Sequence, residues 1–301
     1  MNFAQRIAYA PFLVQVVVTR RCNLSCTYCD EFDQVSPPVP TDLLKRRIDK
    51  IRHLGAWAIE WSGGEPLLHP DLCEITRYAK EQGFTRVMLL SNGFLLDPDK
   101  IVALNLAGLD DLQVSVDGVL PNQSTVKVLK PLRAKLEALA RVAKFRVTLN
   151  AVIGSAPAEE AIEVIAFARE QGFRPRVCLI HDHDGQIKLG ADDTRVYQQI
   201  RRQVGRAFHE SAEYRTRLMR DGRAPFKCRA GSRYLYVDED GSVHWCSQQR
   251  GAFAIPLDEY SPHHLKEQFY TPKSCAEQCT VGCVRSCSRA DQWRWQRAIG
   301  E

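Results

Sequence analysis

The chain has 301 residues, 45% of them hydrophobic and 26% charged, which is the composition of a globular protein with one large domain or two smaller ones. The formal net charge of +5 is too small an excess to predict nucleic-acid binding. No apolar run approaches the roughly 20 residues that span a bilayer, and no signal-peptide pattern opens the chain, so we expect a cytoplasmic protein without a membrane span.

Strand-like and helix-like stretches alternate along the first two thirds of the chain. The β-branched run Phe12 to Thr19 predicts a buried strand, and Thr41 to Leu54 carries apolar residues at helical spacing. The strand-like stretches are 12–19, 56–61, 86–90, 112–116, 145–153 and 176–180. The helix-like stretches are 41–54, 71–82, 97–106, 131–143, 158–171 and part of 192–208. Such alternation with short connections predicts an α/β fold, a parallel sheet curled into a partial (βα)6 TIM-like barrel.

The pattern changes after residue 208. The stretch 209–224 is highly charged and is expected to be a surface connection. Residues 234–237 and 242–245 flank Asp240-Gly241, which predicts a β-hairpin. The sequence therefore predicts a barrel domain over 1–208, a connection over 209–224 and a small cysteine-rich domain over 225–301.

Eleven cysteines are present, and most of them are clustered. Cys22, Cys26 and Cys29 follow the first predicted strand directly. Soft thiolates at this spacing suit an iron–sulfur cluster, and three ligands leave one iron of a four-iron cluster open to a substrate. A zinc ion with a fourth ligand from elsewhere, or buried thiols without a metal, are the alternatives.

The motif Cys22-x3-Cys26-x-Tyr28-Cys29 resembles the signature of radical S-adenosylmethionine (AdoMet) enzymes. This resemblance implies a 4Fe–4S cluster on the three cysteines and AdoMet bound to its open iron. It further implies reductive cleavage of AdoMet to methionine and a 5′-deoxyadenosyl radical, which abstracts hydrogen from a substrate. A low-potential electron donor such as flavodoxin or ferredoxin is the implied partner.

Loops at the ends of later strands are similar to the AdoMet-binding loops of this family. Gly63-Gly64-Glu65 is similar to the loop that receives the amino group of AdoMet, and two glycines let backbone carbonyls approach a ligand closely. Asn150 lies in the segment implied to pass the adenine. The full set that the resemblance assigns to AdoMet is Tyr28, Gly63, Gly64, Glu65, Ser91, Asn92, Ser115, Asp117 and Asn150.

The spacing Cys228-x12-Gly241-x4-Cys246 resembles the start of the SPASM/twitch extension, which carries auxiliary iron–sulfur clusters. The remaining cysteines depart from that pattern, since Cys275, Cys279, Cys283 and Cys287 are separated by three residues each. As one helix this segment would place its end cysteines ~18 Å apart, too far to share one cluster. We expect one auxiliary 4Fe–4S cluster on Cys228, Cys246 and two of the last four, with a second cluster or structural zinc as alternatives.

Several further residues are each compatible with two roles. Cys73 and Cys178 are expected to be core thiols, although Cys178 is also placed to face the barrel interior as a hydrogen donor or acceptor. Lys127 and Lys130 are either solvated or hold an anionic substrate. The loop 181–184, with its two histidines and two aspartates, is either solvated or in contact with substrate.

The tail suggests a basic amphipathic helix that closes the barrel, docks an electron donor, faces a phosphate group or is simply solvated. Its basic and aromatic residues are Arg285, Arg289, Trp293, Arg294, Trp295 and Arg297.

Three functions are compatible with these features. The first is net oxidation of a small metabolite, because only eleven residues precede the first predicted strand, where peptide-modifying members of the family often carry a recognition domain. The second is maturation of a peptide or protein. The third is a non-catalytic metal scaffold, against which the presence of Glu65, Asn92 and Asp117 beside the three cysteines weighs.

Overall fold

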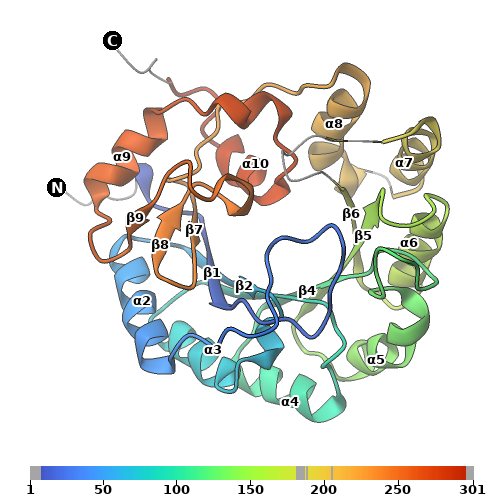
Figure 1. The fold of residues 1–301 in the computed structure, drawn as a ribbon, viewed down its shortest axis with the longest axis horizontal. Helices are drawn as coiled ribbons and strands as arrows, with labels where there is room; N and C mark the ends of the chain where they lie inside the picture. The colour runs from blue at the N-terminus through green and yellow to red at the C-terminus, as the bar shows by residue number, and fades with distance from the viewer. Residues whose placement is uncertain (1–7, 181–186, 188, 205, 296–301) are drawn as a thin grey trace.

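The computed structural model describes residues 8–180, 187, 189–204 and 206–295. None of the helices in these ranges is long and apolar enough to cross a membrane. The strands and helices alternate as the sequence predicts, and Figure 1 shows the helices outside a curved sheet.

The barrel strands are β1 (Leu13–Thr19), β2 (Ala58–Gly63), β3 (Arg86–Ser91), β4 (Asp111–Ser115), β5 (Arg146–Ile153) and β6 (Arg174–Leu179). The helices that connect and follow them are α2 (Thr41–His53), α3 (Leu72–Glu81), α4 (Pro98–Ala107), α5 (Leu129–Val142), α6 (Glu160–Glu170), α7 (Ala191–Val204) and α8 (Arg206–Asp221). All neighbours among β1 to β6 pair in parallel. The predicted partial barrel is confirmed, because β6 and β9 stand at the two ends of an open sheet.

The core lies between this sheet and the outer helices. Val14, Val16 and Val18 pack into it from the first strand and are at most 1% exposed. Val17, on the opposite face of the same strand, packs instead with Tyr234 and Tyr236 in a second, smaller core. Successive side chains of a strand point to opposite faces, so β1 is buried on both sides, as its β-branched run predicts.

The cysteine-rich part continues the barrel sheet. Its elements are β7 (Tyr234–Val237), β8 (Ser242–His244), β9 (Ile255–Pro256), α9 (Pro262–Tyr270) and α10 (Gly282–Arg289). The predicted hairpin forms, because β7 and β8 pair antiparallel. However, β7 also pairs in parallel with β1, with Leu13 opposite Tyr234, so one nine-stranded sheet runs through both parts. The charged stretch expected to be a connection is largely helical, because α8 covers most of it; the division into two domains stays a prediction.

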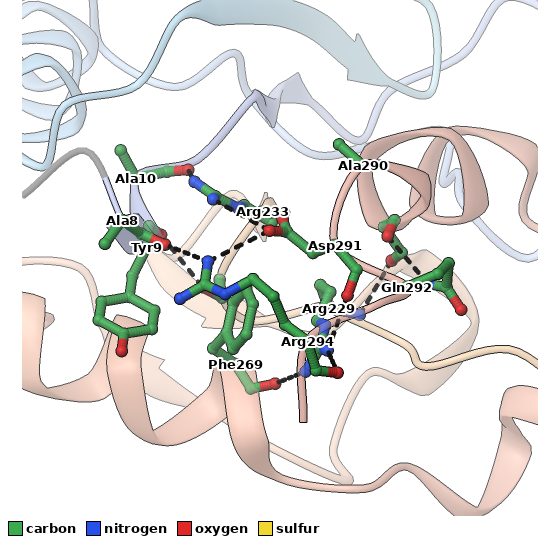
Figure 2. A network of polar contacts seen from close by, with 12 residues as sticks. Ala8, Tyr9, Ala10, Arg229, Arg233, Phe269, Ala290, Asp291, Gln292 and Arg294 are labelled. Atoms are coloured by element: carbon green, nitrogen blue, oxygen red, sulfur yellow. Dashed lines mark hydrogen bonds and ion pairs between the residues drawn. The ribbon is translucent and has the colours of Figure 1, made fainter. Parts of the chain in front are cut away.

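Buried arginines hold the tail to the start of the chain. Figure 2 shows Arg229, Arg233 and Arg294 gathered around Asp291 and the ring of Phe269. Arg233 donates from Nε to Asp291 at 2.7 Å, and Arg294 donates to the carbonyl of Ala8 at 2.8 Å. The guanidinium groups of Arg229 and Arg294 lie 3.9 and 4.1 Å from the centre of the Phe269 ring. Of the tail residues, Arg294 is thus tied into the fold, whereas Trp293 and Trp295 are about four-fifths exposed at 80% and 77%.

Candidate functional site

The predicted site residues gather at the carboxyl ends of β1 to β4. A pocket of about 930 Å³, including its open mouth, lies there. Its lining includes Cys22, Cys26, Cys29, Ser62, Gly63, Gly64, Ser91, Asn92, Ser115 and Lys127. The carboxyl ends of the strands are also where barrel active sites form.

The three cysteines are free thiols on a loop that leaves β1. Cys26 is buried, and its sulfur lies 3.6 Å from the hydroxyl of Thr125. The amide of Thr27 donates to the carbonyl of Ser124 at 3.1 Å, which fastens the cysteine loop to the loop after β4. Burial raises the pKa of the Cys29 thiol to about 11, so this thiol is protonated at neutral pH until a metal displaces the proton.

Gly63 and Gly64 allow the end of β2 to pack against the cysteine loop. A β-carbon at Gly63 would stand 2.0 Å from the carbonyl oxygen of Thr19, and one at Gly64 would stand 2.3 Å from that of Arg20. Gly63 also has a φ of +129°, which other residues rarely adopt. The sequence interpretation placed a ligand against these glycines. The structure shows that they first accommodate backbone of the protein itself.

A methyl group at position 64 is therefore expected to force the two loops apart. Gly64→Ala should lower the free energy of unfolding by about 1–3 kcal/mol, because the backbone has to move to accept it. Thr27→Ala is the control, since Thr27 lies exposed in the same cysteine loop. Urea denaturation of both variants measures the difference, and equal midpoints would show that the close approach is not needed.

Glu65 has a structural task as well as the one implied by resemblance. Its carboxylate is 0% exposed and does not line the pocket. It accepts hydrogen bonds from the Leu67 amide at 3.0 Å, the Ser91 hydroxyl at 2.9 Å and the Asn92 amide at 2.7 Å. These bonds join the loop after β2 to the end of β3. A contact between this carboxylate and AdoMet stays a prediction.

Asn92 connects the end of β3 to the cysteine loop. Its Nδ2 donates to Asn23 Oδ1 at 2.8 Å and lies 3.8 Å from the sulfur of Cys22. Its Oδ1 accepts from the amide of Phe94 at 3.0 Å. The side chain is therefore fixed in place against the first of the three thiols.

Tyr28 and Asp117 contact each other and Lys127, and of these three residues only Lys127 lines the pocket. The Tyr28 hydroxyl donates to the Asp117 carboxylate, and the Ser115 hydroxyl lies 3.3 Å from the same group. Lys127 Nζ is 3.5 Å from Asp117 and 5.1 Å from the centre of the Tyr28 ring. Burial, with the neighbouring Asp117 charge, raises the pKa of Tyr28, so its hydroxyl stays protonated. Lys127 lines the pocket and pairs with Asp117, and a role in holding an anionic substrate stays a prediction.

Asn150 supplies an unsatisfied acceptor. It lies on β5 opposite Ser115 and is 5% exposed. Its side-chain oxygen is buried and has no hydrogen-bond partner in the part of the chain that the structure describes. A buried acceptor without a donor is costly, so a ligand with a hydrogen-bond donor fits this position. Within the described ranges, no three His, Cys, Asp or Glu side chains surround a point that a single metal ion would occupy.

Sequence reasoning missed some residues of this site. Thr125 contacts Cys26, and Gln15 and Gln113 line the pocket from β1 and β4. Gln15 had a signal, because it is a polar residue within an apolar stretch of its strand, whereas Gln113 lies in a strand that also contains Asp111 and Ser115. Thr125 had none, because its contact depends on how two distant loops fold together. The loop 181–184 lies outside the described residues.

The electrostatic neighbours of the six C-terminal cysteines fall into a set of four and a pair, although Cys287 packs in the same small core as Cys228 and Cys246. Burial and the thiols of Cys279, Cys228 and Cys275 raise the pKa of Cys246 well above its usual value. Burial and the Glu60 carboxylate raise the pKa of Cys283 to about 11, and Cys287 has Cys283 and Glu60 as its neighbours.

The backbone explains this division. Residues 274–278 form a 3-10 helix that ends before Cys279, and α10 begins at Gly282. The segment is therefore broken between its second and third cysteines, in agreement with the argument that a single helix could not bring all four to one cluster.

A family model described as the radical SAM superfamily matches residues 16–185 of the chain. The chain belongs to this superfamily. Membership implies a 4Fe–4S cluster and AdoMet, and the three free thiols, the pocket and the orphaned Asn150 oxygen fit these groups.

Curated relatives match the chain over about half of its length. An AdoMet-dependent heme synthase of Methanosarcina barkeri is 34% identical over 172 residues, 54% of this chain and 48% of the relative. A PqqA peptide cyclase of Gluconobacter oxydans is 32% identical over 169 residues, 54% of this chain and 47% of the relative. This radical SAM chain thus spans about half the length of the curated relatives that it matches.

Solved structures with the same fold cover most of the chain. SuiB of Streptococcus suis bound to its precursor peptide SuiA has a TM-score of 0.67 at 15% identity, and the match covers 84% of this chain and 64% of SuiB. The protein anSMEcpe with bound AdoMet and a peptide has a TM-score of 0.62 at 17% identity, with 85% and 80% covered. Both matches extend beyond the barrel into the cysteine-rich part, which supports the predicted extension.

Proposed function

We propose that this radical SAM chain binds a 4Fe–4S cluster through Cys22, Cys26 and Cys29, holds AdoMet in the adjoining pocket and removes hydrogen from an organic substrate inside the barrel. The observation that carries this proposal is the gathering of the three free thiols and the loops after β2, β3 and β4 around one cavity. A reduced cluster with AdoMet supplies a 5′-deoxyadenosyl radical when both are bound.

In this proposal the residues of the chain orient AdoMet. Ser62, Gly63 and Gly64 line the pocket beside the cysteines, and Asn92 lies against Cys22. The Asp117 carboxylate is 1% exposed and is held in place by Tyr28 and Lys127 at the edge of the site; its contact with ligand hydroxyl groups is part of the proposal. These groups act mainly by positioning, because preorganised polar contacts lower the cost of reaching a reactive geometry.

We further propose one auxiliary iron–sulfur cluster on Cys228, Cys246, Cys275 and Cys279. Mutual proximity of these thiols supports the assignment, and it selects two cysteines from the four that the sequence left open. Such a cluster supplies an acceptor for one electron, which would make the net reaction an oxidation.

Iron analysis tests the auxiliary site. In a chain whose Cys22, Cys26 and Cys29 are all alanine, roughly four irons should remain per chain after anaerobic reconstitution. Adding Cys275→Ala or Cys279→Ala should remove them, because a four-iron cluster loses a ligand. Adding Cys283→Ala or Cys287→Ala should leave them in place. Retention of about eight irons, or loss on changing the second pair, would contradict the assignment.

The first candidate substrate class is a small metabolite that is oxidised. Peptide maturation is the second candidate, and it is favoured by the similarity to PqqA peptide cyclases, whose name states a peptide substrate. The first test is common to both. Anaerobically reconstituted protein should show brown iron–sulfur absorbance and should form 5′-deoxyadenosine from AdoMet and dithionite. A colourless protein, or one that forms no 5′-deoxyadenosine, would refute the enzyme reading.

A further inference from the structure

One wall of the pocket lies outside the loops that are assigned to AdoMet. Glu31, Phe32 and Ser247 line the pocket and make up this wall. Ser247 directly follows Cys246, one of the thiols proposed for the auxiliary cluster. In the sheet, β7 lies on the side of β1 away from β2, and Tyr236 of β7 contacts the Glu31 carboxylate. The wall therefore stands across the cysteine loop from the loops after β2, β3 and β4.

The fold holds Glu31 in a fixed position at this wall. The hydroxyl of Tyr236 donates to Glu31 Oε2 at 2.6 Å, and Tyr236 itself is 0% exposed. The amide of Cys22 donates to the carbonyl of Asp33 at 3.0 Å, so the segment that carries Glu31 returns beside the start of the cysteine loop. Glu31 is thus fastened from β7 on one side and placed by the closed cysteine loop on the other.

The second oxygen of the Glu31 carboxylate is open to the pocket. Oε1 has no hydrogen-bond partner in the described part of the chain, yet it does not belong to the fully buried polar atoms that lack a partner. It therefore reaches open space, and the space that Glu31 borders is the pocket. The hydroxyl of Ser247 meets the same two conditions. Two hydrogen-bond acceptors of this wall are therefore available to a ligand.

No close cation neutralises this carboxylate. Among the described residues, no basic side chain lies within ion-pair distance of Glu31. Arg20 acts on it from further away, but Arg20 is itself paired with Asp238 at 3.8 Å and with Glu239 at 3.6 Å. The carboxylates of Asp30 and Asp238 add negative charge around Glu31. The potential at this wall therefore favours a cation.

A ligand cation would also offset the cost of burying the carboxylate. Burial is the largest influence on Glu31, and it raises the pKa of the carboxyl group. Lys127 lines the pocket as well, but its Nζ lies 3.5 Å from Asp117 and is paired there. Phe32 is compatible with a cation, because the faces of aromatic rings attract positive charge.

We propose that Glu31 and Ser247 form a subsite for a protonated amino group of the substrate. The inference rests on the proposed function, since the ligand is the molecule from which hydrogen is removed. A guanidinium pairs best with both oxygens of a carboxylate, whereas an ammonium group directs several N–H donors from one atom. Because Tyr236 already occupies Oε2, the one remaining oxygen suits an ammonium. The substrate is then an organic amine, or a peptide that presents an amino group to this wall.

Two fluorinated ligands of nearly equal shape test the subsite. para-Fluorobenzylamine is a cation at neutral pH, whereas para-fluorobenzyl alcohol is uncharged. Their dissociation constants are measured by fluorine NMR on anaerobic protein that is loaded with its clusters and AdoMet, without a reductant. We expect the amine to bind at least about tenfold more tightly than the alcohol, because hydrogen bonds between charged groups are the strong ones.

Two variants separate this subsite from a general negative potential. Glu31→Gln removes the charge but keeps an acceptor for the Tyr236 hydroxyl, and it should abolish the preference for the amine. Asp30→Asn is the matched control, since Asp30 is the adjacent carboxylate, is exposed and is absent from the pocket lining. This control should keep the preference, because it removes the same charge from outside the pocket.

The proposal is overturned if the wild-type protein does not prefer the amine, if neither ligand binds, or if Asp30→Asn loses the preference as Glu31→Gln does. It is also overturned if Glu31→Gln weakens AdoMet binding and leaves amine binding unchanged, because the carboxylate would then belong to the AdoMet site. AdoMet binding and 5′-deoxyadenosine formation are measured separately on the wild-type protein. Failure there refutes the proposed function, whereas success there without a preference for the amine refutes the subsite alone.

Discussion

Cys26→Ala should abolish formation of 5′-deoxyadenosine and lower the iron content by roughly four atoms per chain. Cys26 is the buried member of the three thiols and contacts Thr125, so it lies where the cysteine loop is fastened to the rest of the site. A four-iron cluster with only three protein ligands has no additional protein ligand that could replace a lost thiolate. Loss of one ligand is therefore expected to eliminate the cluster rather than weaken it.

Cys73→Ala is the matched control for this variant. Cys73 lies on α3 and packs against the core, and it is absent from the pocket lining. Its loss should leave both iron content and 5′-deoxyadenosine formation at the wild-type level. Product analysis by chromatography and iron determination read the two effects independently. Continued formation of 5′-deoxyadenosine by the Cys26 variant would show that the cluster is assigned to the wrong thiols.

Asp291→Ala should destabilise the protein by about 3–5 kcal/mol, because it removes the carboxylate of a buried ion pair. Asp291 pairs with Arg233 at 2.7 Å, and the two side chains are 6% and 7% exposed. Arg294 also contacts Asp291, at 3.1 Å. Arg233 further donates to the carbonyl of Ala10 at 2.8 Å, so the loss should reach the start of the chain as well as its tail.

Urea denaturation of the cluster-loaded protein measures this effect. Asp221→Asn is the control, because Asp221 pairs with Arg220, whose side chain is 70% exposed, and an exposed pair contributes little to stability. The control should keep the wild-type midpoint, whereas the midpoint of the Asp291 variant should fall clearly. A midpoint for Asp291→Ala that equals that of the control would show that the arginine cluster tolerates the loss of its carboxylate.

Local patterns predicted most of the fold. The six barrel strands and the hairpin at Asp240-Gly241 match the structure, because strand periodicity and turn residues are local signals. The parallel pairing of β1 with β7 was not predicted. It joins residues separated by more than two hundred positions, and a strand carries no local mark of which distant strand it will meet.

The site was also predicted only in part, because some of its features depend on local patterns and others on distant contacts. The spacing of Cys22, Cys26 and Cys29 pointed to the pocket that the structure shows, since all three lie on one loop. The division of the C-terminal cysteines into four and two could not be predicted, because it depends on the turn before Gly282 and on the position of Glu60 in the barrel. The hydrogen bonds of Glu65 to Ser91 and Asn92 likewise depend on two neighbouring strands being in place.

The pairing of β1 with β7 also bears on how the chain is made. The second edge of β1 is covered only when Tyr234–Val237 has been synthesised, long after the strand itself. Until then the apolar run around Val17 presents an open strand edge, which is a template for association with other chains. During synthesis, β1 therefore lacks one of its two partner strands until β7 has been made. A chaperone that covers the open edge of β1 would be most useful in that interval.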